Sequence, residues 1–329
     1  MLLGIDVGSI TTKIVAMDDK GDELIASFVT RNEGKPIEAI RRSLNAIEKE
    51  IGNGSYITGV GATGSARFLA AHLLGADIVK NEITCHALAV IDFLPSARTV
   101  IEIGGQDSKI IILRNQVVVD FAMNTVCAAG TGSFLDHQAE RLGLTIDEFS
   151  NLSLKSKRPV RIAGRCTVFA ETDMIHKQQV GNSIEDIIAG LCHALASNYL
   201  NNVGRGKEIL DPVVFQGGVA ANPGIKKALE RELKTSIIVP PHFQLMGAIG
   251  AAKLLRNKRD KKSSFKGFDI AKKEIYTRAF ECDGCGNQCE VIVLLVQGEL
   301  KACWGDQCQR YSSNKKELFI RWEKEQSQI

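Results

Sequence analysis

Two cysteines stand beside glycine-rich turns that precede helical sequence. Cys127 lies in "NTVCAAGTGSFLD", residues Asn124 to Asp136, and Cys166 lies in "AGRCTVFAETD". The dipole and free N–H groups of a helix N-terminus stabilise a thiolate, which is the form that binds iron. Two cysteines cannot complete a four-ligand Fe–S cluster, but two from each subunit of a symmetric dimer can. The pattern therefore raises the hypothesis of a shared cluster.

Three glycine-rich turns after apolar strands could hold phosphate: "IDVGSITTK", "IEIGGQDSK" and "FQGGVAANPGI". Glycine lets the backbone approach a phosphate, and successive N–H groups form an anion-binding nest. Asp6 and Asp107 can hold or orient Mg²⁺, and Lys13 can offset phosphate charge. The chain has no Walker A lysine pattern and no dinucleotide G-x-G-x-x-G after its first strand. We therefore predict ATP binding.

The order of elements is repeated along the chain. Strand, glycine turn, strand, polar turn and strand open the sequence, and the same order returns from Thr99. Helices are expected at 36–51, 64–74, 82–93, 132–142, 170–180 and 184–203, with a strand, a turn and a helix around 213–233. We expect two related lobes facing one another across a cleft, at 1–95 and 96–241. A return helix at about 242–256 joins the first lobe, and 257–329 forms a basic linker and a Cys-rich extension.

Composition excludes several classes of protein. The net charge is +3, and the basic stretch "RNKRDKKSSFK" has no interleaved aromatic residues for base stacking, so we expect no nucleic-acid partner. We find no signal-peptide pattern and no apolar run of about 18 residues, so no membrane association is expected. Nine cysteines without an export signal indicate thiols and metal ligands in the cytoplasm. Cys85 and Cys192, on helices rich in Ala and Leu, are expected to be core residues.

The phosphate turns resemble those of the actin-like ATPase superfamily, which includes acetate and sugar kinases, heat-shock ATPases and actin. The resemblance implies an α/β, two-lobed fold with ribonuclease H-like halves. It also implies that Gln106 or Asp107 positions the attacking water. The ATP-binding residues it implies are, for the first turn, Asp6, Gly8, Ser9, Thr11, Thr12 and Lys13; for the second, Gly104, Gly105, Gln106 and Asp107; and for the nucleoside, Gly217, Gly218, Ala220, Asn222 and Gln244.

A closer resemblance covers about Leu3 to Leu255. The segments "MNTVCAAGTGSFLDHQAERLG", "GRCTVFAETDMIHKQQ", "FQGGVAANPG" and "PPHFQLMGAIGAA" are similar to those of the activators of 2-hydroxyacyl-CoA dehydratases and benzoyl-CoA-type reductases. The resemblance implies a homodimeric ATPase in which Cys127 and Cys166 of each subunit bind one bridging [4Fe–4S] cluster. An electron from ferredoxin or flavodoxin would pass to a partner metalloenzyme: a hydroxyacyl-CoA dehydratase, an aryl-CoA reductase or a double-cubane cluster protein.

The C-terminal tail carries a second set of cysteines. Their C-x2-C-x3-C and C-x4-C spacing is typical of metal ligands, and either zinc, a second Fe–S cluster or a reduced thiol cluster would fit. The residues are Cys282, Cys285, Cys289, Cys303 and Cys308.

Two other functions remain open from the residues. A small-molecule kinase of the same fold, such as an amino-sugar kinase, would need a catalytic Asp but no paired cluster thiols. A nucleotide-gated redox sensor or cluster carrier would bind ATP and a cluster but deliver no electron to an acceptor.

Overall fold

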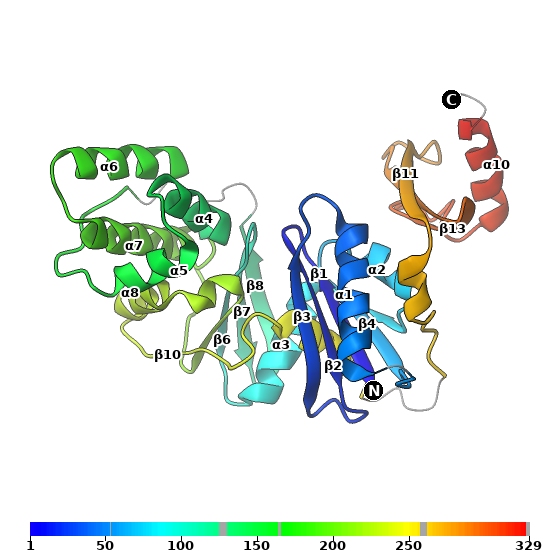
Figure 1. Cartoon of the computed structure of the whole chain (residues 1–329), viewed down its shortest axis with the longest axis horizontal. Helices are drawn as coiled ribbons and strands as arrows, with labels where there is room; N and C mark the ends of the chain where they lie inside the picture. The colour runs from blue at the N-terminus through cyan, green and yellow to red at the C-terminus, as the bar shows by residue number, and fades with distance from the viewer. Residues whose placement is uncertain (53, 125–129, 164–165, 257–261, 327–329) are drawn as a thin grey trace. The chain divides into compact units, whose positions relative to one another are not determined.

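Two units make up the protein in this computed structural model, which describes residues 1–52, 54–124, 130–163, 166–256 and 262–326. The first unit comprises Met1–Lys80 and Leu254–Ile329, and the second comprises Asn81–Lys253. Figure 1 shows both units and labels many of their helices and strands. Among the described residues, no helix has the length and apolar character needed to cross a membrane.

The first unit contains a mixed sheet with the order β3-β2-β1-β4-β5. β1 pairs antiparallel with β2 and parallel with β4. Pro36, which suits the first turn of a helix, opens α1, and Gly52, at φ 85°, follows its last residue. The elements are β1 (Leu2–Val7), β2 (Thr11–Met17), β3 (Leu24–Arg31), α1 (Pro36–Ile51), β4 (Gly59–Thr63), α2 (Arg67–Leu74) and β5 (Ile78–Val79).

The second unit contains a sheet with the order β10-β9-β6-β7-β8. Its strands are β6 (Thr99–Ile103), β7 (Ser108–Arg114), β8 (Val117–Met123), β9 (Val213–Gln216) and β10 (Ile237–Ile238). Its helices are α3 (Glu82–Phe93), α4 (Gly132–Arg141), α5 (Ile146–Ser153), α6 (Thr167–Gln179), α7 (Ile184–Asn202), the 3₁₀ helix η2 (Gly218–Ala221), α8 (Pro223–Leu233) and α9 (Met246–Lys253). The fully buried Tyr199, Phe149 and Phe215 contribute to one apolar core.

The two sheets repeat one topology, as the element order predicts. The order β3-β2-β1-β4-β5 in the first sheet corresponds to β8-β7-β6-β9-β10 in the second, when each sheet is read from the edge strand of its antiparallel part. The repeat extends to side chains: Asp6 on β1 faces Lys13 on β2, and Glu102 on β6 faces Lys109 on β7. The residue equivalent to Asp6 is therefore Glu102, whereas Asp107 lies in the turn that follows β6.

The expected return helix belongs to the second unit rather than to the first. α9 packs on α3 within that unit. A Cβ atom at Gly250 would lie 1.9 Å from the backbone oxygen of Cys85, so glycine is what allows the two helices to approach this closely. The division of the structure consequently falls after Lys80 and after Lys253.

The C-terminal tail forms part of the first unit. It consists of the 3₁₀ helix η3 (Phe268–Lys272), the antiparallel sheet β11 (Ile275–Glu281), β12 (Glu290–Val296) and β13 (Glu299–Trp304), and α10 (Lys315–Gln326). Alternate residues of β12 face opposite sides. Leu294 and Val296 join the apolar core of the first unit, while Val291 and Val293 pack in a second cluster with Leu318 of α10. Trp304 also stacks on His72 of α2, with ring centroids 5.4 Å apart.

Candidate functional site

The first phosphate turn, between β1 and β2, is supported from behind by Asn32. The buried Asn32 side chain donates to the backbone oxygen of Gly8 at 2.7 Å and accepts from the Thr12 hydroxyl at 2.7 Å. Ser9 is exposed and Thr11 is half-buried, so both are accessible to a ligand. The Thr12 side chain is fully buried, and it supports the turn through Asn32.

Asp6 is held at the end of β1 by two close neighbours. Lys13 Nζ lies 3.2 Å from Asp6 Oδ2, and both side chains are largely buried. Gly64 follows β4 at φ 94°, and a Cβ atom there would lie 2.6 Å from Asp6 Oδ1. Gly64 therefore has a role in shaping this site that sequence analysis missed.

The second and third turns lie together in the second unit, because β6 and β9 are parallel neighbours. Gly104 N–H donates to the Asp107 oxygen at 2.8 Å and closes the second turn. Gly217, at φ 90°, follows β9, and a Cβ atom there would lie 2.4 Å from the backbone oxygen of Ile103 at the end of β6. A Cβ atom at Gly218 would meet no described atom within 4 Å, so space is open beside this backbone.

The remaining residues predicted for the nucleoside differ in their surroundings. Asn222 is buried, and its Oδ1 caps α8 by accepting from Gly224 N–H at 2.9 Å and Ile225 N–H at 3.2 Å. Ala220 is buried in η2, and Gln244 is exposed. Gln106 is also exposed, and Asp107 is half-buried.

The second turn rests on a buried ion pair that sequence analysis did not identify. Lys109 Nζ lies 3.1 Å from Glu102 Oε2, with both side chains under a tenth exposed. Burial by itself would lower the pKa of Lys109, but attraction from Glu102 and Asp107 outweighs burial and raises it. The signal in the sequence was the common spacing of seven residues in Asp6–Lys13 and Glu102–Lys109.

Several buried polar atoms near these turns lack a hydrogen-bond partner among the described residues. They are Thr63 Oγ1, Ser108 Oγ, Gln216 Oε1 and Asn222 Nδ2. Buried polar atoms are normally paired, so unpaired ones beside glycine turns indicate a place for a polar ligand. In the second unit, the unpaired atoms of Ser108, Gln216 and Asn222 lie beside the second and third turns, where space is also open at Gly218.

The cysteine loop is fastened at both ends to the second phosphate turn. Cys127 itself lies outside the described residues. Before it, Asn124 Oδ1 accepts from Ser108 N–H at 2.6 Å, and Asn124 Nδ2 donates to the Gln106 oxygen at 3.2 Å. After it, the N–H groups of Gly132 and Ser133 donate to the oxygens of Gly104 and Gly105, both at 2.8 Å. The described residues on both sides of Cys127 are therefore hydrogen-bonded to the second phosphate turn or to the strand that follows it.

Cys166 occupies the N-cap position of α6, and its side chain is half-buried. The helix that follows is tied to α4, because Arg141 of α4 pairs with Glu171 of α6 at 2.7 Å. Val168 and Phe169, one turn from Cys166, are about two-thirds exposed. A partly accessible thiol thus lies at a helix start beside exposed apolar side chains.

Cys85 and Cys192 are buried on helices, which confirms their prediction as core residues. Burial raises the pKa of Cys192 to about 12. In the tail, Cys282 and Cys303 are buried, Cys289 is half-buried, and Cys285 and Cys308 are exposed. Within the described ranges, no group of three or more His, Cys, Asp or Glu side chains is already arranged to hold a metal ion.

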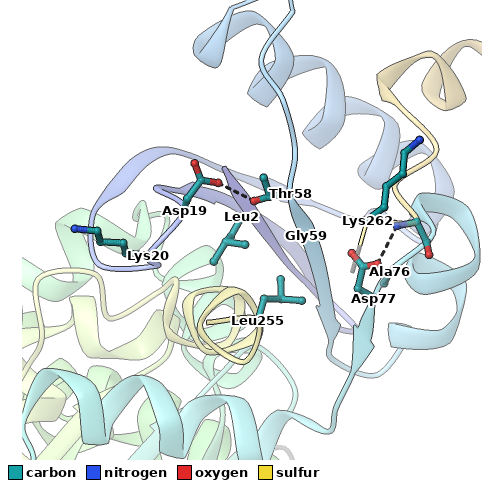
Figure 2. A pocket seen from close by; sticks show the side chains of 10 residues that line it. Leu2, Asp19, Lys20, Thr58, Gly59, Ala76, Asp77, Leu255 and Lys262 are labelled. Carbon is teal, nitrogen blue, oxygen red and sulfur yellow. Dashed lines mark hydrogen bonds between the residues drawn. The ribbon is translucent and has the colours of Figure 1, made fainter. Parts of the chain in front are cut away.

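A cavity of about 570 Å³ in the first unit lies away from the first phosphate turn (Figure 2). Leu2 and Gly59 line it at the amino ends of β1 and β4, and Asp19 and Asp77 lie at its wall. Asp6 and Thr63, beside the phosphate turn, lie at the opposite ends of these strands. The cavity is therefore not the predicted phosphate site.

Comparison with known proteins identifies relatives of most of the chain. The sequence profile of the BadF/BadG/BcrA/BcrD ATPase family matches residues 3–254. The 2-hydroxyisocaproyl-CoA dehydratase activator of Clostridioides difficile is 37% identical over 252 residues, which cover 76% of this chain and 92% of that protein. The (R)-2-hydroxyglutaryl-CoA dehydratase activating ATPase of Acidaminococcus fermentans is 39% identical over 258 residues, covering 76% and 95%.

A solved structure of a dehydratase activator is also similar to this chain. The activator of the 2-hydroxyisocaproyl-CoA dehydratase from Clostridium difficile with bound ADPNP superimposes with a TM-score of 0.73 at 36% identity, covering 78% of this chain and 95% of that one. This likeness confirms the predicted actin-like ATPase fold. The family match ends at residue 254, so the cysteine-rich tail lies outside it.

Proposed function

The chain belongs to the BadF/BadG/BcrA/BcrD ATPase family, and we propose that it is a homodimeric ATPase that drives single electrons into a partner metalloenzyme. The relatives named as activators of 2-hydroxyacyl-CoA dehydratases support a dehydratase as partner. An aryl-CoA reductase or a double-cubane cluster protein would be served by the same chemistry. Ferredoxin or flavodoxin would be the electron donor.

The observation that carries this proposal is the attachment of the cysteine loop to a phosphate turn. Asn124 contacts Gln106 and Ser108, and Gly132 contacts Gly104. An ATPase whose only task was to phosphorylate a small molecule would have no need to couple its phosphate turn to a thiol. The link therefore favours an electron-transfer function over the kinase alternative.

ATP would contact all three turns. Backbone N–H groups of Ser9 and Gly105 would bind phosphate, with Lys13 offsetting its charge, while the N–H groups of Gly8 and Gly104 close the two turns by donating to the oxygens of Thr11 and Asp107. Asp6 and Asp107 would hold Mg²⁺, directly or through water. Gln106, whose side chain is exposed while Asn124 holds its backbone oxygen, would orient the attacking water. The open space at Gly218 would accept the nucleoside, next to Gly217, Ala220, Asn222 and Gln244.

Cys127 and Cys166 of each subunit would supply the four thiolates for one bridging [4Fe–4S] cluster. The cluster, when bound, stores one electron at low potential. The start of α6 would stabilise its negative charge, because the helix dipole and free N–H groups point toward Cys166. The exposed Val168 and Phe169 beside Cys166 support a subunit interface at this place.

The test is iron analysis of anaerobically purified protein with matched cysteine variants. Wild-type protein should hold about four iron atoms per dimer. Cys127→Ser and Cys166→Ser should each lose nearly all iron and still bind ADPNP. Cys192→Ala removes a buried thiol and should retain both the iron and nucleotide binding. The wild type should hydrolyse ATP at a measurable rate without any added small-molecule substrate. A kinase, in contrast, needs no such substrate-free hydrolysis.

Full iron content in either serine variant would contradict the cluster assignment. Iron without electron delivery to any acceptor, at any ATP concentration, would favour the redox-sensor alternative. ADPNP binding serves as the folding control, because it depends on turns that the cysteine changes leave in place.

A further inference from the structure

We propose that four of the five tail cysteines form a zinc site, and that the fifth, Cys303, does not belong to it. The ligands are Cys282, Cys285, Cys289 and Cys308. Four thiolates around one Zn²⁺ make a closed structural site, whose binding free energy adds to folding. None of these four residues is among those proposed for the nucleotide turns or for the Fe–S cluster.

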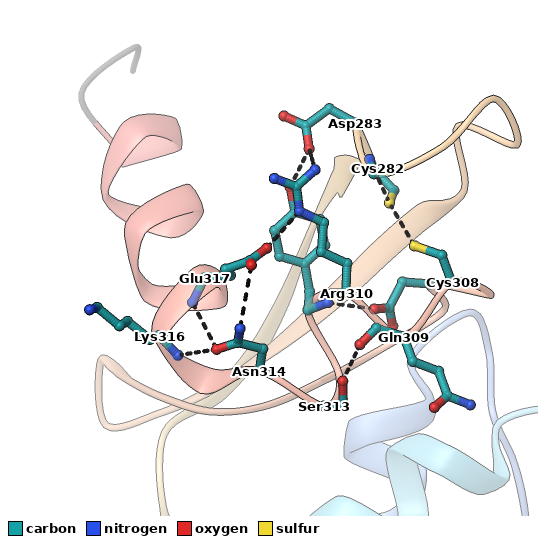
Figure 3. A network of polar contacts seen from close by, with 12 residues as sticks. Cys282, Asp283, Cys308, Gln309, Arg310, Ser313, Asn314, Lys316 and Glu317 are labelled. Atoms are coloured by element: carbon teal, nitrogen blue, oxygen red, sulfur yellow. Dashed lines mark hydrogen bonds and ion pairs between the residues drawn. The ribbon is translucent and has the colours of Figure 1, made fainter.

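Two of the sulfurs already lie at the spacing that zinc requires. Cys282 Sγ and Cys308 Sγ are 3.8 Å apart (Figure 3). A tetrahedral site with Zn–S bonds of about 2.3 Å places its sulfurs roughly 3.8 Å apart. A disulfide would require about 2.0 Å. The N–H of Gly284 donates to Cys282 Sγ at 3.3 Å, a bond that stabilises a thiolate.

The hairpin between β11 and β12 supplies the other two ligands. Glu281 pairs with Glu290, and the next residues continue the ladder, because Cys282 N–H donates to the Cys289 oxygen at 2.8 Å. Side chains directly opposite one another in an antiparallel pair lie on one face, so the Cys289 thiol is on the side of Cys282. Cys285 lies in the turn between them, and its side chain is exposed.

Cys303 is too far along the sheet to be a ligand. It pairs with Val293, which is four residues beyond Cys289 on β12. At about 3.4 Å per residue, this places Cys303 roughly 14 Å along the sheet from Cys282 and Cys289, which begin and end the turn of the hairpin. Its side chain is buried in the apolar cluster that includes Val291 and Leu318. Cys282 belongs to the same cluster, so it is the distance along the sheet that sets Cys303 apart from the ligands. The strand register thus separates Cys303 from the other four cysteines.

A polar network holds the segment of Cys308 against the turn of Cys282 (Figure 3). Arg310 pairs with Asp283 at 3.3 Å and with Glu317 of α10 at 2.6 Å, and the Tyr311 hydroxyl donates to Asp283 at 2.5 Å. These contacts fix the backbone around the ligands, as outer contacts do in metal sites.

Gly284 keeps the space between the two sulfurs clear. A Cβ atom there would lie 3.1 Å from Cys308 Sγ and 3.3 Å from Cys282 Sγ. Cys285 is exposed and Cys289 is half-buried, and the proposed site requires both side chains to rotate toward Cys282 and Cys308.

The test is the zinc content of the full-length protein after loading and removal of excess metal. Wild-type protein should hold about one zinc per chain, and Cys285→Ser or Cys308→Ser should reduce this by at least about tenfold. Cys303→Ala is the matched control and should keep its zinc. Cobalt(II) bound in place of zinc should give the absorption of a tetrahedral thiolate site in the wild type and in Cys303→Ala. Iron content and ADPNP binding should be unchanged in every tail variant, which separates this test from that of the proposed function.

Four results would overturn the zinc site. Three concern protein with an unchanged tail: wild-type protein that retains no zinc after loading, a Cys282–Cys308 disulfide in anaerobic protein, or iron bound in the tail of the Cys127→Ser/Cys166→Ser protein. The fourth is loss of zinc in Cys303→Ala with retention in Cys285→Ser. The first three results can be obtained without any tail variant, so the proposal can be contradicted even if the tail variants do not fold.

Discussion

The N–H of Gly132, the first residue of α4, donates to the backbone oxygen of Gly104 in the second phosphate turn at 2.8 Å. A Cβ atom at Gly132 would lie 3.0 Å from that same oxygen, so the contact depends on glycine. The Ser133 hydroxyl adds a bond to the Gly105 oxygen at 2.6 Å. Under the proposed function, a change at the turn on ATP binding or hydrolysis would reach the helix that follows the cysteine loop through these bonds.

Replacing Asn124 by Ala should weaken this coupling while leaving the cluster ligands in place. The change removes the side-chain bonds to Ser108 N–H and the Gln106 oxygen, each worth about 1 kcal/mol. We expect the ATP-induced change in the rate of iron removal by a chelator to fall several-fold, with iron content retained. Asn201→Ala, which alters an exposed amide on α7, is the matched control. An unchanged ATP effect in Asn124→Ala would show that the coupling does not pass through this side chain.

Gly218→Ala should reduce nucleotide affinity without reducing stability. The added methyl group meets no described protein atom within 4 Å, so the fold has room for it. It would instead occupy space proposed for the nucleoside, at a cost of about 1–3 kcal/mol, or roughly a 5- to 150-fold rise in the Kd for ADPNP. Gly286→Ala, another glycine with open space, should leave that Kd unchanged. Calorimetric titration and urea unfolding measure the two effects, and unchanged affinity would place the nucleoside elsewhere.

Glu102→Gln should lower the free energy of unfolding by about 3–5 kcal/mol, because it leaves the buried Lys109 ammonium unpaired. The double change Glu102→Gln/Lys109→Met should lower the free energy of unfolding by less than Glu102→Gln alone, because it leaves no buried charge unpaired. Since the folded pKa of Lys109 is raised, this stabilisation is present below the unfolded pKa of about 10.4 and is lost only as pH rises through the folded value.

Urea unfolding between pH 6 and 9 should therefore show a constant difference between wild type and Glu102→Gln. Asp22→Asn breaks the exposed pair with Arg256 and should cost about 1 kcal/mol or less. A cost for Glu102→Gln no larger than this control would mean that the pair does not support the turn.

Much of the fold followed from local patterns. The apolar face of α1, with Ile40, Leu44 and Ile47 buried, and the span of α3 were predicted from helical spacing. α5 was missed, although Thr145 and Glu148 form a capping box that marks its start. Its apolar segment is short, and the spacing of buried residues over two turns gives a weak signal.

The candidate site was predictable at its glycine turns and not at their supports. A glycine turn is visible as a motif, whereas Asn32 and Asn124 act through partners 24 and 16 residues away. Glu102 pairs with Lys109 only seven residues away, but this pairing depends on the register of β6 and β7. The position of α9 was likewise set by close packing of Gly250 on the backbone of α3, a contact that no local pattern encodes. In the tail, spacing grouped all five cysteines, and only the strand register separated Cys303 from the others.

The proposed function requires that nucleotide binding alters the environment of an Fe–S cluster held by Cys127 and Cys166. The most direct measurement is the EPR spectrum of the anaerobic, dithionite-reduced dimer, recorded without nucleotide, with ADP and with ATP. We predict a cluster signal that changes line shape on addition of ATP and is absent in Cys166→Ser. A cluster signal that is identical in all three states, or one that persists in Cys166→Ser, would contradict the account.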